Sequence, residues 1–214
     1  MSYINILFDL DGTLTDPYLG ITNSIKYSLG KLGITEENND KLKLFIGPPL
    51  ERLFMEYYSF DKETVKKAVG YYREYFSEKG IYENTLYDGI ENILTELNNK
   101  NKKCILATSK PEIFAGRILE YFRISTYFKY IAGSNMEGAF VEKEDIIRRV
   151  IEKYKLDKKE TIMIGDRKYD IIGANRNGID SIGVLYGYGS REEMENEKPK
   201  YLCAGIMDIL KIIE

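Results

Sequence analysis

The chain has 214 residues, which is enough for one large domain, or one domain with a smaller insertion, around a full apolar core. Its 31 basic and 34 acidic residues give a formal net charge of −3, without the long basic runs that would indicate nucleic-acid or anionic-membrane binding. Histidine and tryptophan are absent, which excludes serine–histidine and cysteine–histidine triads and histidine-ligated zinc. Acid–base chemistry must therefore use carboxylates, lysine or tyrosine.

The sequence has no apolar segment of membrane-spanning length. Asp9 and Asp11 come too early for the apolar part of a signal peptide. Cys104 and Cys203 stand alone in apolar surroundings, which is typical of reduced core thiols. We therefore expect a cytoplasmic protein that acts on small molecules, without a membrane or a nucleic acid polymer as partner. A monomer and a homodimer are equally compatible with the sequence.

The chain begins with one predicted strand and continues with a long helical stretch. The apolar run INILF (4–8) predicts a buried strand. Residues 17–82 contain no convincing strand, and apolar residues recur there at helical spacing. These helical patterns cover 21–32, 48–58 and 62–79. We expect a small all-helical domain at 17–82, inserted into a core made of 1–16 and 83–214.

Strands and helices alternate in the remainder of the chain. Further strand-like runs rich in isoleucine and valine are YIAG (130–133, the weakest), CILAT (104–108), TIMIG (161–165) and SIGVL (181–185). Helical spacing recurs at 89–99, 112–122, 144–154, 169–177 and 205–213. This alternation predicts an α/β fold with a doubly wound, Rossmann-like parallel sheet and helices on both faces.

Polar residues of distinct types follow three of the predicted strands. They are Asp9 and Asp11 after 4–8, Thr108, Ser109 and Lys110 at the end of 104–108, and Gly165 and Asp166 at the end of 161–165. The carboxyl ends of parallel strands share one edge of a sheet, which is where open α/β sheets bind ligands. The sequence therefore predicts one site assembled from segments about 150 residues apart.

The predicted site is rich in carboxylates, because Asp170 closely follows Asp166. Uncompensated carboxylates at Asp9, Asp11 and these two positions would raise one another's pKa values. Mg²⁺ can neutralise such a group, since it binds carboxylate oxygens and keeps room for water and a phosphate oxygen. The carboxylates therefore indicate a magnesium ion and a phosphate ligand.

The neighbouring residues suit phosphoryl chemistry. A carboxylate at a strand end can attack phosphorus, and Asp11 can protonate a leaving oxygen and later activate water. Gly12 permits a sharp turn that aims backbone N–H groups at phosphoryl oxygens. Thr108 or Ser109 can donate a hydrogen bond, and a lysine can supply positive charge.

Four segments in this order carry a family resemblance. They are DLDGTLTD (9–16), ATSK (107–110), VEKEDII (141–147, with Lys143) and IGDRKYD (164–170). Together they resemble the four motifs of the haloacid dehalogenase-like phosphatases, and the resemblance covers the whole chain. It implies that the helical stretch at 17–82 is the cap domain that this family inserts between its first and second motifs.

The resemblance also implies residue roles. Asp9 would be the nucleophile, Asp11 the general acid and base, Thr108 and Lys143 the phosphate-binding residues, and Asp166 the metal carboxylate. Asp9 and the backbone carbonyl of Asp11 would also bind Mg²⁺, and Asp170 would orient Lys143 or a metal-bound water. The acid at Asp11 favours phosphoryl transfer over dehalogenation, because displacement of a halide leaves no oxygen to protonate.

Structural explanations exist for several of these residues. Aspartates often cap turns, and most lysines are solvated surface charges, which leaves the role of Lys110 open. Arg52, in the predicted cap, can meet a substrate carboxylate or a second phosphate, although a helix-surface arginine is more often a simple surface charge. The tyrosines between residues 18 and 87 fit packing better than base stacking.

The substrate is the main open question from sequence. IGPP (46–49) resembles the cap segment of phosphoglycolate phosphatase-like and 5′-nucleotidase-like members, and we expect the former activity with the latter as the alternative. A phosphomutase also remains open. A phosphorylation-receiver module is disfavoured by the chain length and the helical insertion, and a non-catalytic phosphate-binding protein by the completeness of the predicted site.

Overall fold

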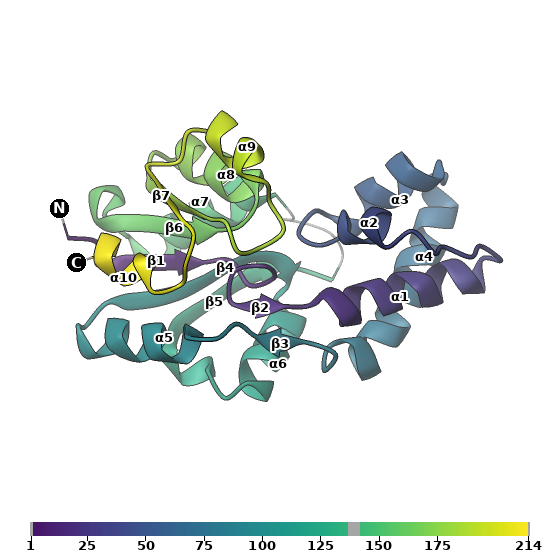
Figure 1. Cartoon of the computed structure of the whole chain (residues 1–214), viewed down its shortest axis with the longest axis horizontal. Coiled ribbons are helices and arrows are strands. Elements are labelled where there is room, and N and C mark those ends of the chain that lie inside the picture. The colour runs from purple at the N-terminus through teal and green to yellow at the C-terminus, as the bar shows by residue number, and fades with distance from the viewer. Residues whose placement is uncertain (1, 137–141, 214) are drawn as a thin grey trace. The chain divides into compact units, whose positions relative to one another are not determined.

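The computed structural model describes residues 2–136 and 142–213 (Figure 1). Val141, the first residue of the third motif, lies outside the described residues. The chain divides into two compact units, one made of Met1–Asp16 with Leu86–Glu214 and the other of Pro17–Thr85. We call the first the core unit and the second the helical unit. No described helix combines the length and the apolar character needed to cross a membrane.

The core unit is built on a six-stranded sheet with the strand order β5-β4-β1-β6-β7-β8. The strands are β1 (Asn5–Phe8), β4 (Lys103–Pro111), β5 (Phe128–Ser134), β6 (Thr161–Gly165), β7 (Asp180–Val184) and β8 (Tyr201–Cys203). Each neighbouring pair is parallel. The continuous apolar runs form these strands because both faces of the sheet are covered. The predicted α/β fold with a parallel sheet is confirmed.

Helices cover both faces of this sheet. Figure 1 shows α7 (Lys143–Tyr154) and α8 (Lys168–Asn177) on one side, with α5 (Ile90–Asn99) and α6 (Glu112–Tyr121) on the other. Alternate strand residues such as Leu7, Ile105 and Met163 pack against α7 and α8 in one buried cluster. The opposite pleat buries residues such as Phe8 and Leu106. Burial on both faces holds the central strands rigidly in place.

Several short elements were not predicted from the sequence. They are β2 (Thr15–Asp16), α2 (Asn39–Lys43), β3 (Thr85–Leu86), the 3₁₀ turns Ser125–Tyr127 and Lys158–Glu160, α9 (Arg191–Asn196) and β8. Segments of two to six residues are too short for an apolar period to repeat. The final helix, α10 (Asp208–Ile213), starts later than expected because residues 205–207 form the turn before it.

The helical unit contains α1 (Tyr18–Lys31), α2, α3 (Leu50–Tyr58), α4 (Lys62–Tyr75) and a π-helical turn, η1 (Phe76–Gly80). Asn38 and Asp61 cap α2 and α4 by accepting backbone N–H bonds. Gly20 and Gly80 allow α1 to approach η1 closely, because a Cβ on Gly20 would lie 2.0 Å from the Gly80 carbonyl oxygen. Four aromatic side chains of this unit pack together in a cluster of Phe45, Phe54, Tyr58 and Phe60.

Candidate active site

The carboxyl ends of β4, β1 and β6 lie side by side at the centre of the sheet. Asp9 follows β1 directly, and its backbone N–H donates to the Ile164 carbonyl of β6 at 2.9 Å. Thr108 lies in β4 on one side, and Asp166 follows β6 on the other. The sheet order therefore brings three of the predicted segments to one edge.

Three carboxylates meet at this edge. Asp9, Asp166 and Asp170 are buried, and each offers an oxygen within 4.8 Å of the oxygens offered by the other two. Lys143 reaches them from the start of α7. Its Nζ lies 2.7 Å from Asp9 Oδ1 and 2.8 Å from Asp170 Oδ1, and it donates to the Ala107 carbonyl at 2.9 Å. We call these four residues the acidic cluster.

Two glycines make the close approach of these carboxylates possible. Gly12 has a φ of +82°, and a Cβ there would lie 2.0 Å from Asp166 Oδ2. A Cβ on Gly165 would lie 2.1 Å from Asp170 Cγ. Asp170 also accepts the backbone N–H of Arg167 at 3.1 Å, which fixes the start of α8. The glycines in DLDGT and IGDRK therefore serve the packing of carboxylates.

The ionisation of the acidic cluster reflects its burial. Burial raises the pKa of Asp166 well above its usual range, and the charges of Asp170 and Asp9 raise it further. Burial likewise raises the pKa of Asp170 to about 6, against the opposing charge of Lys143. Burial disfavours the charged form of Lys143, but the carboxylates of Asp170 and Asp9 outweigh this, so its pKa is raised. The lysine is therefore an ammonium ion.

The donor set of the acidic cluster fits a hard divalent cation. Lys143 offsets one of the three carboxylate charges, so two negative charges remain, and one divalent cation would neutralise them. All the donors are oxygens, as Mg²⁺ and Ca²⁺ require. The raised pKa of Asp166 indicates that its ionised form lacks sufficient compensation from the protein alone. Residues able to hold a divalent metal are thus in place.

Asp11 has a different partner. Its Oδ2 lies 2.8 Å from Lys110 Nζ, and both side chains are nearly inaccessible to solvent. Among the described residues, Asp11 Oδ1 is buried without a hydrogen-bond partner. Burial raises the pKa of Asp11, while the charge of Lys110 lowers it. A carboxyl group with a raised pKa and one unused oxygen can give and take a proton.

The remaining predicted residues occupy varied positions. Thr108 is buried, and its Oγ1 accepts the Lys110 backbone N–H at 3.3 Å. Ser109 is half-buried in β4, where the register with β5 is interrupted between Ala107 and Pro111. Arg52 belongs to α3 of the helical unit and is also half-buried. Printed distances bring Asp9, Gly12, Asp166, Asp170 and Lys143 together, whereas Thr108 and Ser109 are placed at this edge by their position in β4.

Some contacts of the site were missed from the sequence. Thr13 Oγ1 lies 3.4 Å from Asp166 Oδ1, and the backbone N–H of Tyr188 donates to Asp166 Oδ2 at 2.8 Å. The pairing of Lys110 with Asp11 was also unforeseen. A signal for Tyr188 exists, because LYGYGS (185–190) follows a predicted strand at the same sheet edge.

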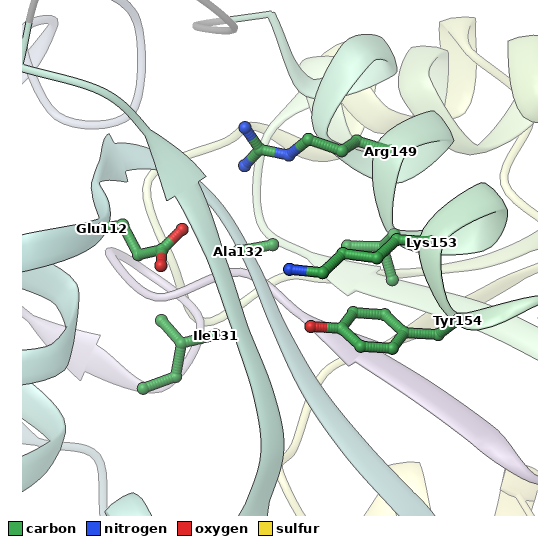
Figure 2. A pocket seen from close by; sticks show the side chains of 7 residues that line it. Glu112, Ile131, Ala132, Arg149, Lys153 and Tyr154 are labelled. Atoms are coloured by element: carbon green, nitrogen blue, oxygen red, sulfur yellow. The ribbon is translucent and has the colours of Figure 1, made fainter.

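A separate hollow of about 160 Å³ lies beside β5, away from the acidic cluster. Figure 2 shows Arg149 and Lys153 extending into it from α7, with Glu112 and Ile131 on the opposite side. Arg149 donates to the Gly133 carbonyl at 2.6 Å, which ties it to β5. The lining of this hollow includes none of the predicted site residues.

Known proteins share both the sequence and the fold. A family model described as haloacid dehalogenase-like hydrolase matches residues 6–184. A 5′-nucleotidase of Pseudomonas aeruginosa is 44% identical over 214 residues, which cover 100% of this chain and 97% of that protein. A crystal structure of a predicted phosphatase from Clostridium acetobutylicum has a TM-score of 0.96 and 48% identity, with 100% of this chain and 99% of that chain covered.

A more distant relative is named for phosphoglycolate phosphatase activity, which we also expect from the sequence. A phosphoglycolate phosphatase of Vibrio parahaemolyticus is 26% identical over 219 residues, which cover 97% of this chain and 95% of that protein. The family resemblance drawn from the four motifs is confirmed by the family model and by these relatives. The chain belongs to the haloacid dehalogenase-like hydrolases and is a phosphatase.

Proposed function

We propose that the protein is a Mg²⁺-dependent phosphomonoesterase that hydrolyses small phosphate esters through an aspartyl-phosphate on Asp9. The observation that carries this proposal is the buried acidic cluster. Two residues after its Asp9 comes Asp11, a carboxyl group with a raised pKa. Asp9, Asp166 and the backbone carbonyl of Asp11 would hold the ion. When bound, Mg²⁺ supplies positive charge to the phosphoryl oxygens.

The first half-reaction transfers the phosphoryl group to the protein. A carboxylate oxygen of Asp9 attacks phosphorus, and the bond from phosphorus to the ester oxygen breaks. Asp11 gives its proton to that leaving oxygen, so the alcohol departs neutral. Lys143, held 2.7 Å from Asp9, contributes charge that offsets the charge on the transferring group.

The second half-reaction releases phosphate. The Asp11 carboxylate accepts a proton from water, whose oxygen attacks phosphorus as the bond to Asp9 breaks. Thr108, Ser109 and the backbone N–H groups near Gly12 are our candidates for binding the phosphoryl oxygens. Asp170 orients Lys143 through their 2.8 Å ion pair. Both aspartates return to their starting protonation states.

We propose nucleoside 5′-monophosphates as the substrate class. The support is comparative, since the relative named 5′-nucleotidase is 44% identical and the one named phosphoglycolate phosphatase is 26% identical. Phosphoglycolate is the second candidate, favoured by Arg52, a cation that can meet its carboxylate. The helical unit would act as the cap that selects between them.

A panel of esters tests the reaction and the substrate together. Phosphoglycolate, nucleoside monophosphates, sugar phosphates and pyrophosphate are assayed with Mg²⁺ and with excess EDTA. We expect nucleoside monophosphates to give the highest kcat/KM, and Asp9→Asn to lower kcat at least about 10³-fold, because it removes the nucleophile. Absence of turnover with Mg²⁺, or full activity in Asp9→Asn, would contradict the proposed mechanism.

Arg52 distinguishes the two substrates. If it binds a substrate carboxylate, Arg52→Ala raises KM for phosphoglycolate about 10-fold or more, since a hydrogen bond to a charged group contributes about 1.5–3 kcal/mol. KM for a nucleoside monophosphate changes less. Lys66→Ala, at an exposed cation of α4 in the same unit, is the control. Equal KM values for phosphoglycolate in Arg52→Ala and Lys66→Ala would contradict a role of Arg52 in binding this substrate.

A further inference from the structure

The loop at residues 185–190, with the sequence LYGYGS, connects β7 to α9 and contacts the acidic cluster. We call it the 185–190 loop. The backbone N–H of Tyr188 donates to Asp166 Oδ2 at 2.8 Å, while the hydroxyl of the same tyrosine donates to Asp16 Oδ1. One residue therefore joins the candidate metal carboxylate to Asp16, the last residue of the core unit before the helical unit begins.

Tyr186 makes a parallel set of contacts. Its hydroxyl donates to the Thr13 carbonyl at 2.9 Å, within the turn that follows Asp11. Its ring lies edge-on to Tyr87, with ring centroids 5.2 Å apart. Tyr87 is the second residue of the core unit after the helical unit ends. The 185–190 loop thus contacts core residues at both points where the chain passes between the units.

Two glycines place this loop against the site. A Cβ on Gly187 would lie 2.3 Å from the Gly12 carbonyl oxygen and 2.4 Å from Asp166 Cβ. A Cβ on Gly189 would lie 2.0 Å from the Asp166 carbonyl oxygen. Neither glycine has a positive φ. Closeness to Asp166, rather than backbone conformation, is therefore the reason for glycine at both positions.

The far end of the loop is anchored to the same motif as Asp166. Ser190 Oγ accepts the Glu193 backbone N–H at 3.0 Å and so caps α9. Glu193 in turn lies 2.9 Å from Arg167 Nε and accepts the Lys168 backbone N–H at 2.9 Å. Arg167 directly follows Asp166. The 185–190 loop is therefore tied to the segment IGDRKYD both through Tyr188 and, by way of α9, through Glu193.

We propose that Tyr188 is a positioning residue for the metal site, because its two hydrogen bonds fix the position of Asp166 relative to Asp16. Its amide fixes one oxygen of Asp166, so the carboxylate enters the acidic cluster already oriented. The hydroxyl bond to Asp16 keeps that amide in place. Groups that orient metal ligands in this way typically change metal affinity about 10–100-fold when they are removed. This inference rests on the metal assignment in the proposed function.

Calorimetric titration with Mg²⁺ tests the positioning role of Tyr188 without relying on turnover. Tyr188→Phe removes only the hydroxyl, and Gly187→Ala pushes the loop away from Asp166. We expect both to weaken Mg²⁺ binding about 10-fold or more. The controls are Tyr121→Phe, on α6, and Gly116→Ala, which meets nothing within 4 Å; both should bind Mg²⁺ like the unaltered protein.

Asp16→Ala, which removes the oxygen that accepts the Tyr188 hydroxyl, completes a double-mutant cycle. It should weaken Mg²⁺ binding as Tyr188→Phe does, and the double variant should be no weaker than either single one. Raising Mg²⁺ should restore kcat in Tyr188→Phe, which a general loss of structure would not allow. Unchanged Mg²⁺ affinity in Tyr188→Phe and Gly187→Ala would overturn the inference alone. Absence of Mg²⁺ binding in the unaltered protein would overturn the metal assignment, and the inference with it.

Discussion

Lys143 is the buried cation on which the charge balance of the acidic cluster depends. It is 4% exposed and faces Asp9 and Asp170, while its ammonium also donates to a backbone carbonyl. A buried ion pair adds little net stability compared with apolar residues, but removing one partner leaves the other charge uncompensated. The stability of the metal-free core unit is therefore sensitive to this lysine.

Lys143→Ala should lower the free energy of unfolding by about 3–5 kcal/mol in excess EDTA. Urea denaturation followed by circular dichroism measures this change. Saturating MgCl₂ should recover part of the loss, because the bound cation replaces some of the missing positive charge. Lys211→Ala, at an exposed cation of α10, is the control and should leave the unfolding curve unchanged. Equal curves for the two variants would contradict the charge balance described here.

The site residues differ in how far the sequence could predict them. Asp9 and Asp166 follow apolar strands directly and Asp11 comes two residues after Asp9, so the parallel sheet alone predicts that they gather at one edge. The pairing of Lys110 with Asp11 depends on a side-chain conformation in β4 that no residue pattern encodes. Tyr188 contacts Asp166 through its backbone N–H, so its side-chain type does not predict the contact, and only its place after a predicted strand at the same edge could indicate it.

At the scale of elements, close helix packing in the helical unit depends on glycine. Gly20 faces the backbone of η1, whereas Gly70, inside α4, meets nothing within 4 Å. The two positions share a residue type but differ in their surroundings. They therefore allow steric crowding to be separated from the intrinsic helix propensity of alanine.

Gly20→Ala should destabilise the protein by about 1–3 kcal/mol, because the added methyl group would collide with the Gly80 carbonyl. Gly70→Ala should stabilise it by about 0.5–1 kcal/mol, since alanine restricts the unfolded chain and favours the helix. Urea denaturation of the two variants gives both values. A stabilising Gly20→Ala would show that α1 and η1 can separate without cost.

The predictability of the elements follows their length and burial. Runs such as TIMIG matched β6 residue for residue, because a strand that is buried on both faces gives an almost continuous apolar run. YIAG gave only part of β5, since Lys129 interrupts its apolar run near the start. β8 escaped prediction because YLC offers three residues without a repeat, and it is recognised only by its pairing with β7.

At the scale of the whole molecule, buried carboxylates couple stability to pH. The pKa of Asp170 is raised from 3.8 to about 6 by burial, so the folded protein retains a proton that the unfolded chain releases. Between about pH 4 and pH 6 the folded state thus binds more protons than the unfolded state. Stability from this group is present below that window and is lost as pH rises through it.

We expect the difference in unfolding free energy between the unaltered protein and Asp170→Asn to fall by about 1–3 kcal/mol as pH rises from about 4 to 6 in excess EDTA. Asparagine cannot titrate, so subtracting its curve removes the contributions of other groups. Saturating Mg²⁺ should flatten the difference, because the ion favours the charged carboxylate. A difference that rises with pH would contradict the raised pKa.

The order of strands in the sheet has a consequence for synthesis of the chain. β1 is made first, yet its partners are Lys103–Leu106 and Thr161–Ile164, which are made long afterwards. The helical unit is one continuous segment, Pro17–Thr85, with local contacts that form quickly. We therefore expect the helical unit to fold on the ribosome while β1 remains unpaired, and the sheet edge with the acidic cluster to assemble only after β6 emerges.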